Sequence, residues 1–234
     1  MPNSWTFCFI DQAYRNENSR LGFYESQYKA IEEIEDQFGE MQGVTYESYL
    51  INLYNSVNEL AKNPTSTVAR SSLIQNATAF IEKSENVYKG LKDYQTTLNT
   101  QVKNMVDSIN KLGDKIYTLN KKISKIESTG IEDANDLRDE RDAAIDELSK
   151  YIDITYYEND SKEVVISAEG IPFITMGELA KMDTRVVEGT NLVIPTWPGY
   201  ERDVYDLSTE ASNVDDTDKG ELKGLLIARG NMVV

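Results

Sequence analysis

The sequence has no histidine and one cysteine, Cys8, among its 234 residues. These absences remove the commonest general base, the Ser-His and Cys-His nucleophile pairs and the usual zinc ligands. Carboxylate, lysine and tyrosine chemistry remains, as in an acid hydrolase with two facing acids, but 40 Asp and Glu residues make chance pairs plentiful. The composition therefore predicts a protein that is not an enzyme, with no catalytic residues, cofactor or metal.

Positive charge and long apolar runs are also scarce. The formal net charge is -16, with 24 Lys and Arg residues, whereas nucleic acids and anionic membranes are bound through clusters of cations. No apolar stretch approaches the roughly 18 residues of a membrane span, and no charged-then-apolar signal peptide opens the sequence. We therefore expect neither nucleic acid nor a membrane as a partner.

Two helical patterns open the chain. From Ile10 to about Phe38, apolar residues recur at steps of three and four, which places them on one helical face. The segment 39–45 interrupts this pattern, and a second helix runs from Tyr46 until Asn63-Pro64. The apolar face expected for the first helix consists of Leu21, Tyr24, Tyr28, Ile31, Ile34 and Phe38.

A third helix of about sixty residues carries a nearly unbroken heptad seam, and Thr65, Ser66 or Thr67 can cap its start. At 1.5 Å per residue it is about 90 Å long. The seam is an internal bundle core or an intermolecular coiled coil; the other helices offer matching faces, which favours the bundle. Its residues are Leu91, Leu98, Val102, Met105, Ile109, Leu112, Ile116, Leu119, Ile123 and Ile126, continued back through Tyr88, Ile81, Ala77 and Ile74, with Gln95 as the polar exception.

A fourth helix follows the break at Ser128 to Gly130, and Asp133 or Asn135 can cap it. An antiparallel hairpin about Gly130 would bring Leu137 near Ile123. After residue 151 the period becomes alternating, which predicts short strands. These strands are expected at 154–157, 163–167, 171–175 and 191–195, followed by an acidic loop over 200–219 and a last helix from Glu221.

The fold class that these patterns predict is mainly α: an elongated antiparallel helical bundle or hairpin rod with a small β-rich appendage. We expect four parts. Residues 1–8 form a non-native or disordered leader, 9–152 a long helical rod domain, 153–219 a small β-rich domain with the acidic loop, and 220–234 the truncated start of a returning helix.

Two polar features invite a functional interpretation. Arg141 faces the bundle, where it either forms a register-fixing salt bridge or snorkels to the edge of the seam, the slightly favoured alternative. The acidic stretch from Asp215 to Glu221 fails as a calcium loop, because Lys219 would occupy a ligand position and Leu226 the position of the bidentate glutamate. We interpret that stretch as a solvated loop.

Several stretches together carry a family resemblance. Asn135-Asp-Leu-Arg-Asp-Glu-Arg-Asp, followed by Asp146-Glu-Leu-Ser149 and Ile152-Asp-Ile-Thr155, resembles the signature of flagellar hook-associated protein 1, the first hook-filament junction protein. Segments 9–15, 60–64 and 220–226 also resemble that family, although Glu140 stands where it often has glutamine. The motif residues that we single out, with the possible register salt bridge, are Asn135, Asp136, Leu137, Asp139, Arg141 and Asp142.

The resemblance implies a structural component of the bacterial flagellum. Its partners would be hook protein and the second hook-filament junction protein, with self-association into a ring in the full-length protein and a monomeric fragment here. It also implies an extracellular location, reached through the flagellar type III apparatus without a cleaved signal peptide. The alternative is a secreted or surface coiled-coil binding module, of the adhesin or needle-tip type, with another partner.

Overall fold

A computed structural model describes residues 4–39, 45–128, 133–207, 211–212 and 214–230, and the side chains from residue 10 onward. The first helix begins at Ser4, within the segment 1–8 that we expected to be a leader. Gly130, about which the hairpin was expected to fold, lies outside the described residues. None of the described helices is long and apolar enough to cross a membrane.

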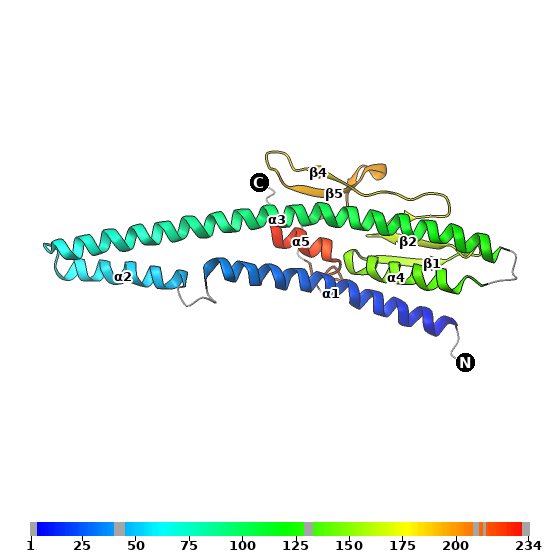
Figure 1. Ribbon diagram of the computed structural model, residues 1–234, viewed down its shortest axis with the longest axis horizontal. Helices are drawn as coiled ribbons and strands as arrows, with labels where there is room; N and C mark the ends of the chain where they lie inside the picture. The colour runs from blue at the N-terminus through cyan, green and yellow to red at the C-terminus, as the bar shows by residue number, and fades with distance from the viewer. Residues whose placement is uncertain (1–3, 40–44, 129–132, 208–210, 213, 231–234) are drawn as a thin grey trace. The chain divides into compact units, whose positions relative to one another are not determined.

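The described chain is mainly α with small antiparallel sheets, as the sequence predicts (Figure 1). One sheet has the order β1-β2-β3 and the other the order β4-β5-β6. The helices are α1 (Ser4–Phe38), α2 (Tyr46–Lys62), α3 (Thr67–Glu127), α4 (Asn135–Tyr151) and α5 (Glu221–Arg229). The strands are β1 (Ile154–Glu158), β2 (Val164–Ala168), β3 (Ile171–Ile174), β4 (Asp183–Val186), β5 (Val193–Trp197) and β6 (Arg202–Asp203), with the 3-10 turn η1 (Pro198–Tyr200).

Two strands were not predicted. β4 is mostly exposed, and its sequence shows no alternation of apolar and polar residues. It therefore lacks the pattern that predicts a half-buried strand. β6 has only two residues and lies in the segment 200–219 that we expected to be a loop. Both pair with β5 in antiparallel register.

The described chain separates into two compact units, one comprising residues 1–27 and 98–234 and the other residues 28–97. The boundary cuts through α1 and α3. The division expected from sequence instead placed a boundary after residue 152, where the hydrophobic period changes, and it stays a prediction about how the chain is organised.

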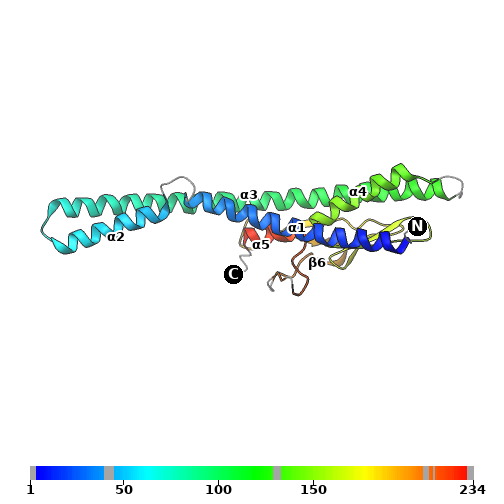
Figure 2. The same cartoon turned by 90° about the horizontal axis from the view of Figure 1, so that it is seen from below.

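The core of the first unit is built on the C-terminal part of α3, along which α4 runs back (Figures 1 and 2). Leu119, Ile123 and Ala134 form a buried cluster against which Leu137 packs, which confirms the expected neighbours Leu137 and Ile123. Gly113 lets the sheet approach α3, since a Cβ there would lie 2.6 Å from Cζ of Phe173.

The start of each long helix tests a capping prediction. Ser66 Oγ accepts a hydrogen bond from the Ala69 amide at 3.2 Å, so the predicted cap of α3 is confirmed. For α4 the prediction is wrong, because its N-cap residue is Ala134 and has no side-chain cap. Oε1 of Glu127 on α3 accepts the Ala134 amide at 3.0 Å, so a carboxylate from another helix binds the backbone just before the first turn of α4.

In the first unit, α1 buries a different face from the one expected. Leu21 and Tyr24 are 50% and 51% exposed, whereas the polar and small residues on the other side of the helix are covered. The prediction of an apolar inner face is therefore wrong here. Small residues permit the close backbone approach that α1 makes to its neighbours, and that approach outweighs apolar periodicity. The buried residues of this face are Arg15, Ser19, Gly22, Phe23 and Ser26.

The second unit has a thin core in which α2 packs on the N-terminal part of α3. The rings of Phe38, Tyr46 and Phe80 form a chain of aromatic contacts, and the hydroxyl groups of Tyr46 and Ser84 are 3.1 Å apart. Val87 is buried. The backward extension of the seam is wrong as a buried face, because its large residues are exposed: Ile74 66%, Ile81 56% and Tyr88 69%. In this part of α3 the covered residue is Val87 rather than Tyr88.

Replacing Ile116 by Asp tests the seam in the first unit. The Ile116 side chain is fully buried, so an unpaired carboxylate there should cost more than about 4 kcal/mol of unfolding free energy. Thermal melting followed by circular dichroism measures the loss. Thr118→Asp, at an exposed position of the same helix, is the matched control, and equal melting temperatures of the two variants would contradict the assignment.

Candidate functional site

Asn120 on α3 binds the backbone of β2 as a neighbouring strand would. Its Nδ2 donates to the carbonyl oxygen of Val164 at 2.8 Å, and its Oδ1 accepts the Val164 amide at 3.0 Å. Asn120 is 1% exposed. Both backbone groups of one buried residue are therefore satisfied by a single side-chain amide, which Val164 needs because β3 pairs with β2 only from Ile166 onward.

Two further asparagines repeat this arrangement. Asn110 donates to the Met182 carbonyl at 2.8 Å and accepts the Met182 amide at 2.9 Å. Asn99 donates to the Asn191 carbonyl at 3.0 Å and accepts the Val193 amide at 2.8 Å. We call these three side chains the amide clamps. They are spaced by about three helical turns, so they lie on a similar side of α3 and fasten successive segments of the β-rich part to it.

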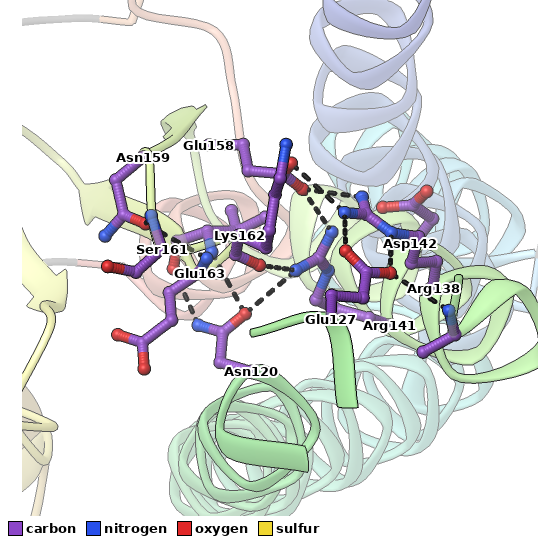
Figure 3. A network of polar contacts seen from close by, with 12 residues as sticks. Asn120, Glu127, Arg138, Arg141, Asp142, Glu158, Asn159, Ser161, Lys162 and Glu163 are labelled. Carbon is purple, nitrogen blue, oxygen red and sulfur yellow. Dashed lines mark hydrogen bonds and ion pairs between the residues drawn. The ribbon is translucent and has the colours of Figure 1, made fainter. Parts of the chain in front are cut away.

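The clamp at Asn120 continues into a charged network, which Figure 3 shows from close by. Arg141 donates to Asn120 Oδ1 at 3.2 Å, to the Lys162 carbonyl at 2.9 Å and to Glu158 Oε2 at 2.8 Å. Arg138 bridges Glu158, at 2.8 Å, and Glu127, where two hydrogen bonds measure 2.7 and 2.6 Å. The network thus links α3, α4 and β1.

The hydrogen bonds of the network determine whether its two carboxyl groups are ionised. The hydrogen bond from Arg138, opposed by burial, lowers the pKa of Glu127 to about 2. Burial acts against ionisation of Glu158 too, but hydrogen bonds from Arg138 and Arg141 lower its pKa. Both carboxylates are therefore ionised at neutral pH, so they hold the two guanidinium groups through charge-assisted hydrogen bonds.

A second polar contact joins α1 to α4. Arg15 Nε donates to Asp146 Oδ1 at 2.7 Å, and its guanidinium lies 4.3 Å from the centroid of the Tyr156 ring. Asn18 donates to the Asp146 carbonyl at 2.8 Å and to Ser149 Oγ at 3.0 Å. Arg15 is 4% exposed, so its charge is neutralised by Asp146 and covered by the aromatic ring.

Glycines seat α5 against α1 and α4. A Cβ on Gly224 would lie 2.0 Å from Ser26 Oγ and 2.8 Å from the Phe23 carbonyl oxygen, so only glycine fits. The amide of Gly220 donates to the Ser19 carbonyl at 3.0 Å, and Gln27 donates to the Gly224 carbonyl at 2.6 Å. Together with the contacts of Arg15 and Asn18, these contacts hold α1, α4 and α5 against one another.

The residues singled out from sequence fall into distinct places. In the seam, Leu98, Val102, Ile109, Leu112, Ile116, Leu119 and Ile123 are buried, Leu91 and Met105 are half-buried, and Ile126 is 36% exposed. In the motif, Asn135, Asp136, Asp139 and Asp142 are exposed and Leu137 is half-buried. Arg141 is 2% exposed, so it does not snorkel to solvent.

The sequence analysis missed the amide clamps and both polar residues of α1. A signal for the clamps exists: Asn99, Asn110 and Asn120 recur at helical spacing beside a hydrophobic seam, where a polar residue must find a partner. For Arg15 and Asn18 the partner Asp146 lies too far along the chain for any local pattern. Within residues 10–230 as described, no three His, Cys, Asp or Glu side chains are grouped to hold a metal ion.

In the first unit, α3 and α4 form a helical hairpin, and buried amide clamps and ion pairs attach the β sheets to it. The class of protein is therefore a mainly α scaffold with a β-rich appendage. The family model described as flagellar hook-associated protein FlgK helical domain matches residues 31–234. The chain therefore belongs to the flagellar hook-associated protein FlgK family.

Two longer proteins are similar to the chain over most of its length. It is 29% identical over 210 residues to flagellar hook-associated protein 1 of Bacillus subtilis (strain 168), covering 89% of this chain and 39% of that protein. Its fold is similar to that of the flagellar hook junction protein FlgK from Burkholderia pseudomallei, with a TM-score of 0.69 and 18% identity over 94% of this chain. It covers 38% of that chain, so it spans about two fifths of the length of either relative.

Substituting Asn120 by Ala tests the central clamp. Loss of the amide leaves the Val164 amide and carbonyl and one Arg141 donor without their partner, and we expect a cost of about 2–4 kcal/mol in unfolding free energy. Denaturant titration measures it, and Asn104→Ala, at an exposed position of α3, is the matched control. A cost below about 0.5 kcal/mol would show that the clamp adds no stability.

Substituting Gly224 by Ala tests the seat of α5. Alanine favours helix formation in general, but here its Cβ would force α5 away from Ser26 and Phe23. We expect a lower melting temperature and faster proteolysis near α5. Gly177→Ala is the control, because a Cβ at Gly177 would meet open space; an unchanged or higher melting temperature for Gly224→Ala would contradict the seat.

Proposed function

We propose that this chain is part of a structural subunit of the bacterial flagellum, an adaptor at the junction between hook and filament. The observation that carries the proposal is the match of residues 31–234 to the FlgK helical domain. The relative from Burkholderia pseudomallei with a similar fold is itself a flagellar hook junction protein. Such a role needs a surface that keeps its shape under load rather than a reactive centre.

The contacts described above fit that mechanical role. Stability in the first unit comes from a buried seam, amide clamps on backbone groups and charge-assisted hydrogen bonds, all of which are directional or densely packed. A unit held in this way resists internal rearrangement when force acts on it. The partners that we propose are hook protein on one side and the second hook-filament junction protein on the other.

We further propose an extracellular location in the flagellum, reached by export of the unfolded chain through the flagellar type III apparatus. The single cysteine means that the chain forms no internal disulfide that would resist unfolding before export. Self-association into a ring belongs to the full-length protein in this proposal, and the chain of 234 residues is monomeric. No feature of the described residues favours an adhesin or a needle-tip module over the junction role.

Pull-down of the purified chain, and of a full-length relative carrying it, tests the proposal against hook protein and the second junction protein. We expect the full-length protein to retain both partners. Light scattering at micromolar concentration should give the mass of one chain for the 234-residue protein. Retention of neither partner by the full-length protein would overturn the junction role, whereas a stable dimer or ring of the short chain would overturn only its monomeric state.

A further inference from the structure

Two of the amide clamps include a buried arginine from another helix. In the Asn120 clamp, Oδ1 also accepts a hydrogen bond from Nη1 of Arg141, which comes from α4, at 3.2 Å. In the Asn99 clamp, Oδ1 accepts the Val193 amide at 2.8 Å and Nη1 of Arg229 at 2.7 Å. Arg229 is the last residue of α5, so the two clamps are completed from different helices.

Arg229 binds the strand as well as the asparagine. Its Nη1 also donates to the Val193 carbonyl oxygen at 2.5 Å. β6 pairs with β5 at Thr196 and Trp197, the opposite end of β5 from Val193. The amide and the carbonyl of Val193 are therefore bonded by side chains of α3 and α5 rather than by β6, and both groups need these partners because they belong to a buried residue.

The burial of the clamp makes its hydrogen bonds costly to lose. Arg229 is 4% exposed and Asn99 is 7% exposed, so a polar group there that loses its partner keeps its desolvation cost. A cation in the last turn of α5 also interacts favourably with the carbonyl end of that helix. Arg229 is thus positioned by α5, and it reaches β5 only while α5 keeps its place.

A different side of α5 determines where this helix lies. Gly224 precedes Arg229 by five residues, which separates the two by about 140° around the helix axis. Gly224 approaches Ser26 and Phe23 so closely that no Cβ would fit. α5 therefore contacts α1 on one side and binds β5 on another, so a displacement of α5 from α1 would withdraw Arg229 from the Asn99 clamp.

We propose that α5 controls how firmly the β4–β5–β6 sheet is attached to α3. While α5 is seated on α1, Arg229 completes the Asn99 clamp; when α5 is displaced, the clamp loses this partner and β5 separates locally from α3. Asn110 still holds Met182 before β4, and the β1–β2–β3 sheet stays attached because Arg141 of α4 completes its clamp. The inference concerns this chain alone and does not depend on the junction role.

Hydrogen exchange of single amides, followed by nuclear magnetic resonance on the intact chain, tests the proposal. The Val193 amide reports on the Asn99 clamp, and the Val164 amide, bound by Asn120, is the internal reference. Gly224→Ala displaces α5 without changing any residue that binds β5. It should raise the opening equilibrium of the Val193 amide at least about 10-fold more than that of the Val164 amide.

Arg229→Met removes the guanidinium and keeps a long side chain. It should produce the same selective rise in the exchange of the Val193 amide. When it is combined with Asn99→Ala, the effect should be smaller than the product of the two separate effects, because both substitutions remove the same hydrogen bond. Arg202→Met is the matched control, since it makes the same change at an exposed position of β6, and it should leave the Val193 amide unchanged.

The proposal is overturned if Gly224→Ala speeds exchange in α5 but raises the Val193 and Val164 amides equally, or if Arg229→Met has no more effect than Arg202→Met. Should a variant fail to fold, exchange of the wild-type chain in low denaturant decides. There the Val193 amide should open together with the α5 amides, at a lower free energy than the Val164 amide. Exchange of Val193 only in the unfolding event that exposes Val164 would overturn the proposal.

Discussion

The side-chain amide of Asn120 is the point at which α3, α4 and the first sheet meet. It satisfies the amide and carbonyl of Val164 and accepts a hydrogen bond from Arg141 while almost fully buried. Burying so many polar groups is favourable only when they find partners, because each unpaired one retains its desolvation cost. The ion pairs of Arg138 and Arg141 with Glu158 depend on that register, and the antiparallel course of α4 along α3 places them within reach.

The helices, most strands and the class of the fold follow from patterns within a short window of sequence. The seam from Leu98 to Ile123 repeats every seven residues, and the strands alternate, because in each case burial on one side acts on neighbours in the chain. Arg141 was recognisable as a polar residue on a buried face, but its actual partners, Asn120 and Glu158, come from α3 and β1. Local periodicity shows that such a residue needs a partner and does not identify the partner.

Two of the wrong predictions, the buried face of α1 and the cap of α4, have the same physical origin: contacts with other helices. The apolar stripe of α1 through Leu21 and Tyr24 predicted burial, yet Gly22 and Ser26 lie on the face that approaches α4 and α5 most closely. A hydrophobic pattern predicts burial from the free energy of transferring side chains out of water. Where two helices lie very close together, the size of the side chains decides instead, and small residues are favoured. For α4 the local rule also failed, because no side chain caps the first turn and the Ala134 amide finds its acceptor in Glu127, on another helix.

The amide clamps grip peptide groups rather than side chains, and this has a consequence for how the protein can change over evolution. Every residue except proline carries both an amide and a carbonyl, so the hydrogen bonds that attach the β-rich part to α3 do not depend on which side chains stand at Val164, Met182 and Val193, although these side chains are themselves buried. Exposed residues of that part, such as Tyr157 and Val186, can therefore change while three asparagines on one helix maintain its position.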